Sequence, residues 1–172
     1  RDLLLALVLG TEVECRIGLS ISPQHYAKGW HITSSCGGFG AAAASARLLG
    51  LDAARTVWAL GSAATQASGL CECLGTASKS VSVGNAARNG LLSALLAQDG
   101  FDGPPEPLAG VQGFFHALGE TPDLAALTDG SGPVNSKTAQ QLQQLNAGWS
   151  FTAPGVGGYP YRERPTPIPT LE

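Results

Sequence analysis

Residues 39–52 read FGAAAASARLLGLD, and this stretch decides the fold class. Alanine and leucine are among the strongest helix formers, so the run from Phe39 to Leu49 is predicted to be a helix. Gly50 is placed to end that helix in the left-handed conformation, and Asp52 is placed to cap the next one. The stretch therefore predicts two consecutive helices joined by a tight turn.

The helix that starts at Asp52 is predicted to run to about Leu70. One of its faces is apolar, and small residues lie beside that face, which favours close approach of a neighbouring helix. The apolar face carries Val57, Leu60 and Ala64, and the small residues are Gly61, Thr65 and Gly69. Further glycines and caps predict three more helices, from Asn85 to Ala97, from Gly113 to Leu118 and from Asp123 to Leu127. The last of these follows Thr121-Pro122, a typical cap and first-turn pair.

Before residue 39, one apolar face recurs at helical spacing. Its members are Leu5, Leu9, Val13 and Ile17. This predicts a buried opening helix rather than a signal peptide, because no small-residue cleavage site follows the leucine run. No apolar stretch approaches the roughly 20 residues that span a bilayer.

No alternating strand pattern of useful length occurs before Gly130. The sequence therefore predicts an all-α protein, with a helical bundle over residues 1–130. Residues 131–172 are rich in serine, glutamine, proline and glycine, and we expect an irregular, poorly packed C-terminal tail there. Within it, residues 136–145 are predicted to form a polar helix and residues 160–169 an extended segment.

The composition limits the classes of partner. The net charge is −3 and the pI is about 5.6, so the chain lacks the basic surface that nucleic acid or an anionic membrane requires. Charged residues make up 13% of the 172 residues, about half of the usual share of roughly 25%. We therefore expect a partner subunit or a further domain to cover part of the surface. There is no methionine and the sequence starts at Arg1, so we expect this chain to be a fragment.

The four cysteines do not indicate a metal site. Their positions are Cys15, Cys36, Cys71 and Cys73, and no pair has the C-x-x-C spacing of zinc or redox motifs. We expect buried or incidental thiols in a reducing, intracellular compartment, the cytoplasm or a mitochondrion.

Two polar segments could carry chemistry. Residues 25–33 contain two of the three histidines, and the glycine-rich residues 36–40 follow them, ahead of the predicted helix. The backbone N–H groups and positive dipole at a helix N-terminus favour a carboxylate ligand, and His31 could donate or accept a proton near neutral pH. The alternative is a structural loop whose glycines only form tight turns.

The second segment, residues 78–85, carries Lys79 and also precedes a predicted helix. It lacks the spacing of a phosphate-binding loop, so a nucleotide site is not predicted. Lys79 is interpreted either as an anion ligand or as a solvated surface lysine. His116, beside two phenylalanines, is interpreted as a packed or surface histidine.

These segments also carry a resemblance to the MmgE/PrpD family, which includes 2-methylcitrate dehydratase and cis-aconitate decarboxylase. The similarity covers about residues 1–129, with several linked motifs in the right order. The motifs are YAKGWHIT at 26–33, GFGAAAA at 38–44, RLLGLD at 47–52, TQASGL at 65–70, the segment 79–90 and the segment 110–118.

The resemblance implies a lyase that dehydrates or decarboxylates a small di- or tricarboxylate, with no metal or organic cofactor. It implies a large helical domain, a smaller α+β lid domain and a homodimer. By motif position, His31 and Lys79 are the implied catalytic residues, and Thr33 and Ser82 are implied to bind substrate. Ser82 occupies the position where the family motif has a histidine.

Two alternatives stay open. One is an isomerase or epimerase of the same family, and the other is a catalytically inactive remnant or interaction subunit. The family's upstream Asp and His motif and the lid's lysine and tyrosine have no counterpart in this sequence, which favours the second. For either reading, His31 and Lys79 are predicted to face one shared pocket, and which residue is the base is left unassigned.

Overall fold

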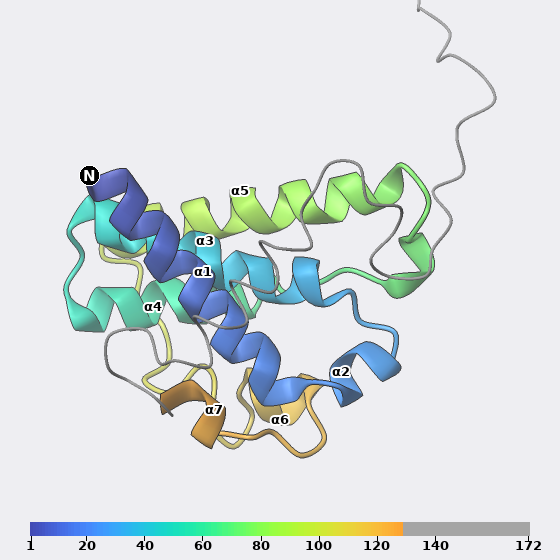
Figure 1. The fold of residues 1–172 in the computed structure, drawn as a ribbon. Helices are drawn as coiled ribbons and strands as arrows, with labels where there is room; N and C mark the ends of the chain where they lie inside the picture. The colour runs from blue at the N-terminus through green and yellow to red at the C-terminus, as the bar shows by residue number, and fades with distance from the viewer. Residues whose placement is uncertain (129–172) are drawn as a thin grey trace, which may run out of the picture. The chain divides into compact units, whose positions relative to one another are not determined.

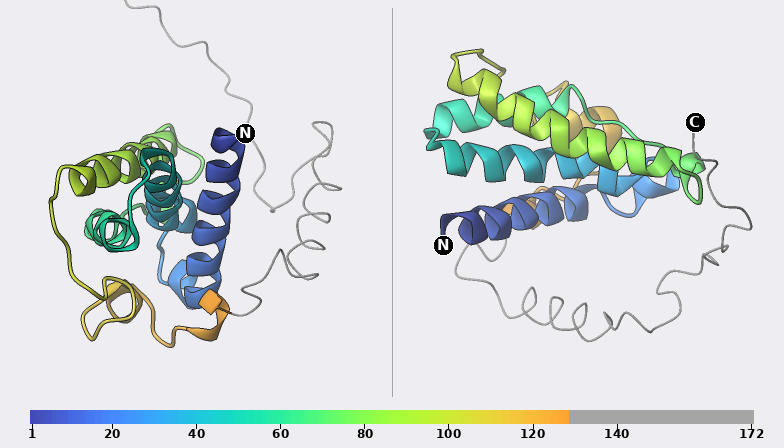
Figure 2. Two further views of the ribbon diagram at one scale, coloured as in Figure 1. Left: turned by 90° about the vertical axis from the view of Figure 1, so that its left-hand side faces the viewer. Right: turned by 90° about the horizontal axis from the view of Figure 1, so that it is seen from above.

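The computed structural model describes residues 1–128, and helix α3 (Ile32–Leu49) lies at the centre of their arrangement (Figure 1). Helices α1 (Asp2–Ile21) and α5 (Ser78–Gln98) pack along different sides of α3 (Figure 2). Helix α4 (Ala53–Ala64) packs against both α3 and α5. The central helix therefore contacts every other long helix.

Three short helices complete the described part: α2 (Gln24–Ala27), α6 (Phe114–Leu118) and α7 (Ala125–Thr128). A 3-10 turn, η1 (Cys71–Cys73), lies between α4 and α5. Residues 1–128 contain no strand, only an isolated bridge between Trp30 and Leu70. The all-α prediction is confirmed, whereas the predicted tail and its polar helix lie outside the described residues.

The opening helix is confirmed, but half of its predicted buried face is wrong. Ile17 is buried and Val13 packs against the core, whereas Leu5 and Leu9 are 48% and 41% exposed. The N-terminal half of α1 instead meets α3 through small residues, mainly Ala6 and Gly10. Leucine side chains would not fit where the two backbones come so close.

Helix α3 starts at Ile32, seven residues before the predicted Phe39. The glycine-rich residues 36–40 are therefore helical, and the prediction of a loop there is wrong. Gly40 lies where α1 comes closest: a Cβ on Gly40 would lie 2.9 Å from the carbonyl oxygen of Gly10, whereas a Cβ on Gly37 or Gly38 would meet no atom closer than 3.6 Å. Close packing offsets the cost of glycine inside a helix, about 1 kcal/mol each.

The turn between α3 and α4 is as predicted. Gly50 has a φ of 68° at the end of α3, and the Asp52 carboxylate accepts a hydrogen bond of 2.8 Å from the backbone N–H of Arg55. However, α4 ends at Ala64, not near Leu70. The chain turns away there, and Gly69 adopts a φ of 115° that a helix does not allow.

Helix α5 starts at Ser78, seven residues before the predicted Asn85. Lys79 and Ser82 are therefore in its first turns and not in a loop before it. The hydrophobic pattern missed these turns because residues 78–81 are exposed and have no buried face to reveal the helical period.

The core is built on aromatic rings. Phe39 and Phe114 meet edge to face with ring centroids 4.8 Å apart, and Phe115 is fully buried beside them. Helix α6 is thus confirmed as predicted. Helix α7 starts later than predicted, at Ala125, because the Asp123 backbone N–H donates to the Ser20 carbonyl of α1 and its carboxylate caps Ala125 instead.

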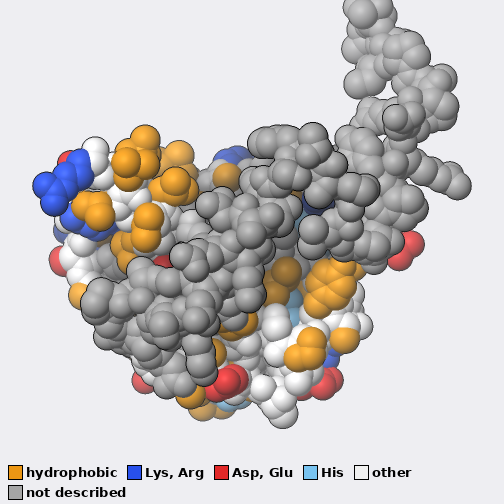
Figure 3. Space-filling view, in the orientation of Figure 1, with side chains coloured by type: hydrophobic (Ala, Val, Ile, Leu, Met, Phe, Trp, Pro, Cys, Tyr) orange, Lys and Arg blue, Asp and Glu red, His pale blue; other side chains and the backbone are white. Residues whose placement is uncertain are grey.

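The N-terminal half of α1 presents a large apolar surface, which we call the α1 leucine surface. Figure 3 shows hydrophobic side chains gathered over this end of the helix. Its members, between 41% and 69% exposed, are Leu3, Leu4, Leu5, Leu7, Val8 and Leu9. No helix within residues 1–128 is both long and apolar enough to cross a membrane.

Candidate functional site

His31 is the N-cap residue of α3 and only 5% exposed. Its carbonyl accepts hydrogen bonds from the N–H groups of Ser34 and Ser35, as expected at the start of a helix. Its own N–H donates to the Gly69 carbonyl over 3.0 Å, and the Cys71 N–H donates to the Gly29 carbonyl over 2.8 Å. The loop after α4 is thereby fixed against the segment that leads into α3.

A chain of side-chain hydrogen bonds connects α3 with α5 at this point. The Nδ1 atom of His31 lies 3.0 Å from Ser34 Oγ, and Ser34 Oγ lies 2.8 Å from Ser82 Oγ. Ser82 Oγ donates in turn to the Lys79 carbonyl oxygen over 2.8 Å. We call His31, Ser34, Ser82 and Lys79 the histidine–serine cluster.

Ser34 is the member of this cluster that the sequence reasoning missed. It lies one helical turn after the N-cap histidine, a spacing at which side chains near a helix start commonly meet. It is buried, and a Cβ on Gly69 would lie 2.5 Å from the Ser34 Cβ. Glycine at position 69 therefore serves two needs, the positive φ and the space that Ser34 occupies.

The electrostatics of the cluster favour a neutral imidazole. Burial lowers the pKa of His31, and the nearby positive charge of Lys79 lowers it further. The Lys79 side chain itself is exposed to solvent. A neutral imidazole beside an exposed ammonium group can accept a proton while the cation holds an anion.

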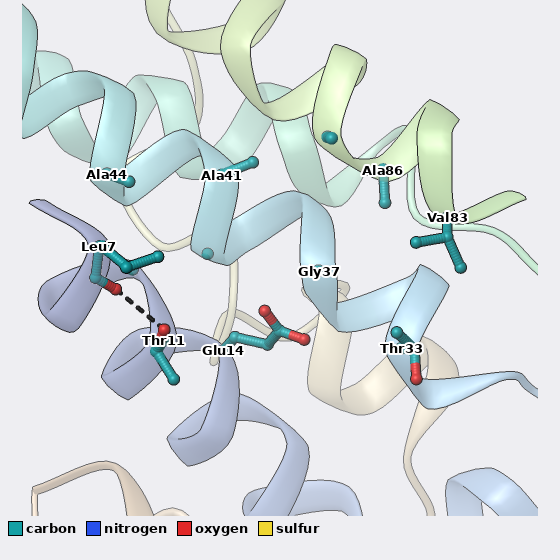
Figure 4. Close-up of a pocket in the computed structure, with 12 residues that line it drawn as sticks. Leu7, Thr11, Glu14, Thr33, Gly37, Ala41, Ala44, Val83 and Ala86 are labelled. Atoms are coloured by element: carbon teal, nitrogen blue, oxygen red, sulfur yellow. Dashed lines mark hydrogen bonds between the residues drawn. The ribbon is translucent and has the colours of Figure 1, made fainter. Parts of the chain in front are cut away.

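Thr33, the other residue implied to bind substrate, lies apart from this cluster. It is exposed and lines a pocket of about 280 Å³ between α1, α3 and α5, together with Glu14, Gly37 and Val83 (Figure 4). A second pocket, of about 480 Å³, lies between α4, α6 and residues 104–113. Neither of these pockets is lined by His31 or Lys79, so the predicted shared pocket of those two residues stays a prediction.

Glu14 is the ionisable side chain of the first pocket, and its carboxylate points toward α3 (Figure 4). A Cβ on Gly40 would lie 2.9 Å from its Oε2 atom, so the carboxylate lies against the α3 backbone. Burial raises the pKa of Glu14. Within residues 1–128 no cation or hydrogen-bond donor pairs with this carboxylate.

His25, the other histidine of the predicted loop, has a structural role. It is fully buried, its Nδ1 lies 3.2 Å from the Leu118 carbonyl oxygen, and its Nε2 lies 2.7 Å from Ser35 Oγ. Its ring stacks on Trp30 with centroids 5.9 Å apart. Of the two open interpretations of residues 25–33, the structural one thus applies to His25, and the candidate-site one applies to His31. His116 is a surface residue.

The residues that could ligate a metal are scattered. Within residues 1–128 no three His, Cys, Asp or Glu side chains come together as a metal site would require. The four cysteines form no disulfide with one another, and burial raises the pKa of the Cys36 thiol to about 12. That thiol is therefore unreactive at neutral pH.

Comparisons with known proteins agree on one family. The MmgE/PrpD N-terminal domain matches residues 1–127. The uncharacterized protein Rv2277c of Mycobacterium tuberculosis is 82% identical over 50 residues, which are 29% of this chain and 17% of that protein. The cis-aconitate decarboxylase-like protein oryM of Aspergillus oryzae is 44% identical over 104 residues, 59% of this chain and 22% of that protein.

A mammalian relative covers more of the chain. The cis-aconitate decarboxylase of Mus musculus is 34% identical over 129 residues, 73% of this chain and 26% of that protein. The chain thus spans between 17% and 26% of the length of these three relatives.

Proposed function

Because this chain belongs to the MmgE/PrpD family, we propose that its histidine–serine cluster binds a carboxylate of a small di- or tricarboxylate. The whole protein would be a lyase that dehydrates or decarboxylates a substrate of the 2-methylcitrate or cis-aconitate type. Several relatives bear the name cis-aconitate decarboxylase, which supports this substrate class.

The observation that carries the proposal is the meeting of two helix starts at one cluster. His31 caps α3, Lys79 lies in the first turn of α5, and Ser34 and Ser82 connect the two helices by hydrogen bonds. Helix N-termini carry a partial positive charge, so two of them beside a lysine favour a bound anion.

The same residues suit the chemistry of the class. Removing a proton next to a carboxylate requires a base and a positive charge that stabilises the developing anion. His31 is held neutral by its lowered pKa and can act as the base, while Lys79 supplies the charge. The cluster thereby provides two of the groups that such a dehydration needs.

One observation favours a second candidate, binding without turnover. Ser82 stands where the family motif has a histidine, and its hydroxyl is engaged with Ser34 and with the Lys79 carbonyl. A serine hydroxyl does not change its protonation state near neutral pH as an imidazole does. The chain would then recognise the carboxylate but lack one proton-transfer group.

The test is a binding titration of the 172-residue chain with cis-aconitate and with citrate, followed by calorimetry and by amide chemical shifts. Lys79→Ala is expected to weaken binding about tenfold or more, since a charge-assisted hydrogen bond contributes about 1.5–3 kcal/mol. Lys28→Ala is the matched control, because Lys28 pairs with Glu120 elsewhere. No binding by the unmodified chain at millimolar ligand contradicts the proposal.

Turnover separates the two candidates. The same samples are assayed for carbon dioxide release from cis-aconitate and for loss of water from 2-methylcitrate. Binding that Lys79→Ala weakens, without any product, supports recognition alone. Product formed by the unmodified chain and lost in His31→Ala supports the lyase.

A further inference from the structure

The hydrogen bonds of the histidine–serine cluster have a definite direction. It is set at the Lys79 carbonyl oxygen, which can only accept. The single hydroxyl hydrogen of Ser82 therefore points to that oxygen, 2.8 Å away. Ser82 Oγ then has no hydrogen left for Ser34 and must accept from it.

The same reasoning carries the direction to the imidazole. Ser34 Oγ has one hydrogen, and it is donated to Ser82 Oγ over 2.8 Å. Ser34 Oγ can therefore only accept at its contact with Nδ1 of His31, 3.0 Å away. The hydrogen of that bond must lie on Nδ1.

The reverse direction is less favourable. If Ser82 donated to Ser34, and Ser34 to His31, no hydrogen would lie between Ser82 Oγ and the Lys79 carbonyl oxygen. Two oxygen lone pairs would then face each other at 2.8 Å. When hydrogens are donated from His31 to Ser34, from Ser34 to Ser82 and from Ser82 to the Lys79 carbonyl, no two lone pairs face each other.

We propose that Ser34 and Ser82 are positioning residues that hold His31 in the tautomer with hydrogen on Nδ1, which leaves the Nε2 lone pair to receive the substrate's proton. This assignment rests on the proposed function. Nε2 makes no hydrogen bond within residues 1–128, whereas every fully buried side-chain polar atom there has a partner. Nε2 is therefore not fully buried, although His31 as a whole is only 5% exposed.

His25 shows why this arrangement distinguishes the two histidines. Its Nδ1 also carries the hydrogen, because its partner is the Leu118 carbonyl. Its Nε2, however, accepts from the Ser35 hydroxyl over 2.7 Å in the buried core. Of the two, only His31 has an unoccupied Nε2 lone pair.

In a dehydration, His31 would first take up the substrate's proton and later return it to the leaving hydroxyl. The C–H bond next to the substrate carboxylate breaks, the proton forms an N–H bond at Nε2, and the electron pair stays on the substrate as a carboxylate-stabilised carbanion. The positive charge of Lys79, near enough to lower the pKa of His31, stabilises that negative charge. When the hydroxyl leaves, it takes the proton from Nε2 and departs as water, which returns His31 to its neutral tautomer.

The test is nitrogen-15 NMR of the histidine side chains in the 172-residue chain at pH 8, where His31 is neutral. The protonated and unprotonated ring nitrogens have well-separated shifts, so the tautomer is read directly. We expect a ratio of Nδ1–H to Nε2–H above about 5:1 for His31, since one net hydrogen bond is worth about 1 kcal/mol or more. A predominant Nε2–H tautomer overturns the proposal.

The variant Ser82→Ala provides the second readout. Without Ser82, the Ser34 hydroxyl is released to donate to Nδ1, so the ratio is expected to fall to about 1:1 or below. Ser82→Thr keeps a hydroxyl and should restore the unmodified ratio, and Ser80→Ala, on the exposed face of α5, should leave it unchanged. An unchanged ratio in Ser82→Ala contradicts the role of the serines.

This experiment is independent of ligand. A chain that shows Nδ1–H but does not bind cis-aconitate contradicts only the proposed function. A chain that binds cis-aconitate through Lys79 but shows Nε2–H contradicts only the tautomer assignment.

Discussion

Gly10 of α1 and Gly40 of α3 touch backbone to backbone: a Cβ on Gly10 would lie 2.6 Å from the Gly40 carbonyl oxygen. On another side of α3, a Cβ on Gly90 of α5 would lie 2.4 Å from the Ala41 Cβ. Both distances are shorter than real Cβ contacts. The spacing of the three long helices is therefore one that only glycine permits at these points.

Gly90→Ala is expected to destabilise the chain by about 1–3 kcal/mol, because the added methyl group meets the α3 backbone and must push the two helices apart. The measurement is urea unfolding followed by circular dichroism. Gly84→Ala is the matched control on the same helix, where a Cβ meets nothing within 4 Å. It should stabilise the chain by about 0.5–1 kcal/mol through helix propensity. Equal effects of the two substitutions would contradict this account of the packing.

Acid is expected to weaken the fold through His25. Burial lowers the pKa of His25, more than its hydrogen bond to Leu118 raises it, so the unfolded chain binds a proton more readily than the folded one. The neutral ring contributes its whole stabilisation above the unfolded pKa of about 6.5. This contribution is lost as the pH falls from that value through the lower pKa of the folded chain.

The readout is the slope of the unfolding free energy between pH 7 and pH 5. His25→Gln should make this slope smaller, since one proton accounts for at most about 1.4 kcal/mol per pH unit. His116→Gln, at a surface position, is the control. A slope that is the same in His25→Gln as in the unmodified chain refutes the assignment.

Glu14→Gln is expected to stabilise the chain at pH 7 by up to about 1 kcal/mol, a value that allows for partial screening of a half-buried group by water. The pKa of Glu14 is raised, so its ionised form is the one that the fold disfavours. The gain should shrink as the pH falls through the raised pKa toward 4.5 and vanish below that value, because the carboxyl is then protonated in the folded and unfolded chain alike. Glu12→Gln, which loses the ion pair with Arg16, should show no gain.

The α1 leucine surface is expected to drive self-association. An apolar patch on this scale is typical of a surface that another protein covers. Leu4→Glu combined with Val8→Glu places two charges one helical turn apart and should shift the sedimentation profile toward the monomer. Val111→Glu, at a 92% exposed position, is the control. A concentration-independent monomer of the unmodified chain would rule this out.

The sequence predicted those helices whose signals are local. Gly50 and Asp52 set the turn between α3 and α4 by backbone conformation and side-chain capping alone. The start of α3 was placed too late because glycine is read as a helix breaker unless the neighbouring helix is known. Whether Gly40 ends a helix or admits the backbone of Gly10 depends on a contact between segments thirty positions apart. The start of α5 was placed too late because its exposed first turn shows no hydrophobic period.

The candidate site was also predicted only in part. Motif resemblance pointed to His31, Lys79 and Ser82, and the structure connects the first and last of these through Ser34. Nothing in the sequence separates Ser34 from other serines near helix starts. The direction of its hydrogen bonds depends on Ser82, which only the packing of α5 on α3 brings within reach.

The contact of bare backbones at α1, α3 and α5 also has a mechanical consequence. Where side chains separate two helices, a change of rotamer can absorb a small displacement. At Gly10, Gly40 and Gly90 no rotamer exists, so a shift of one helix must be passed on to the next as a whole. We therefore expect the three helices to behave as one stiff frame, in which the backbones of His31 and Lys79, each at the start of a helix, keep a fixed separation.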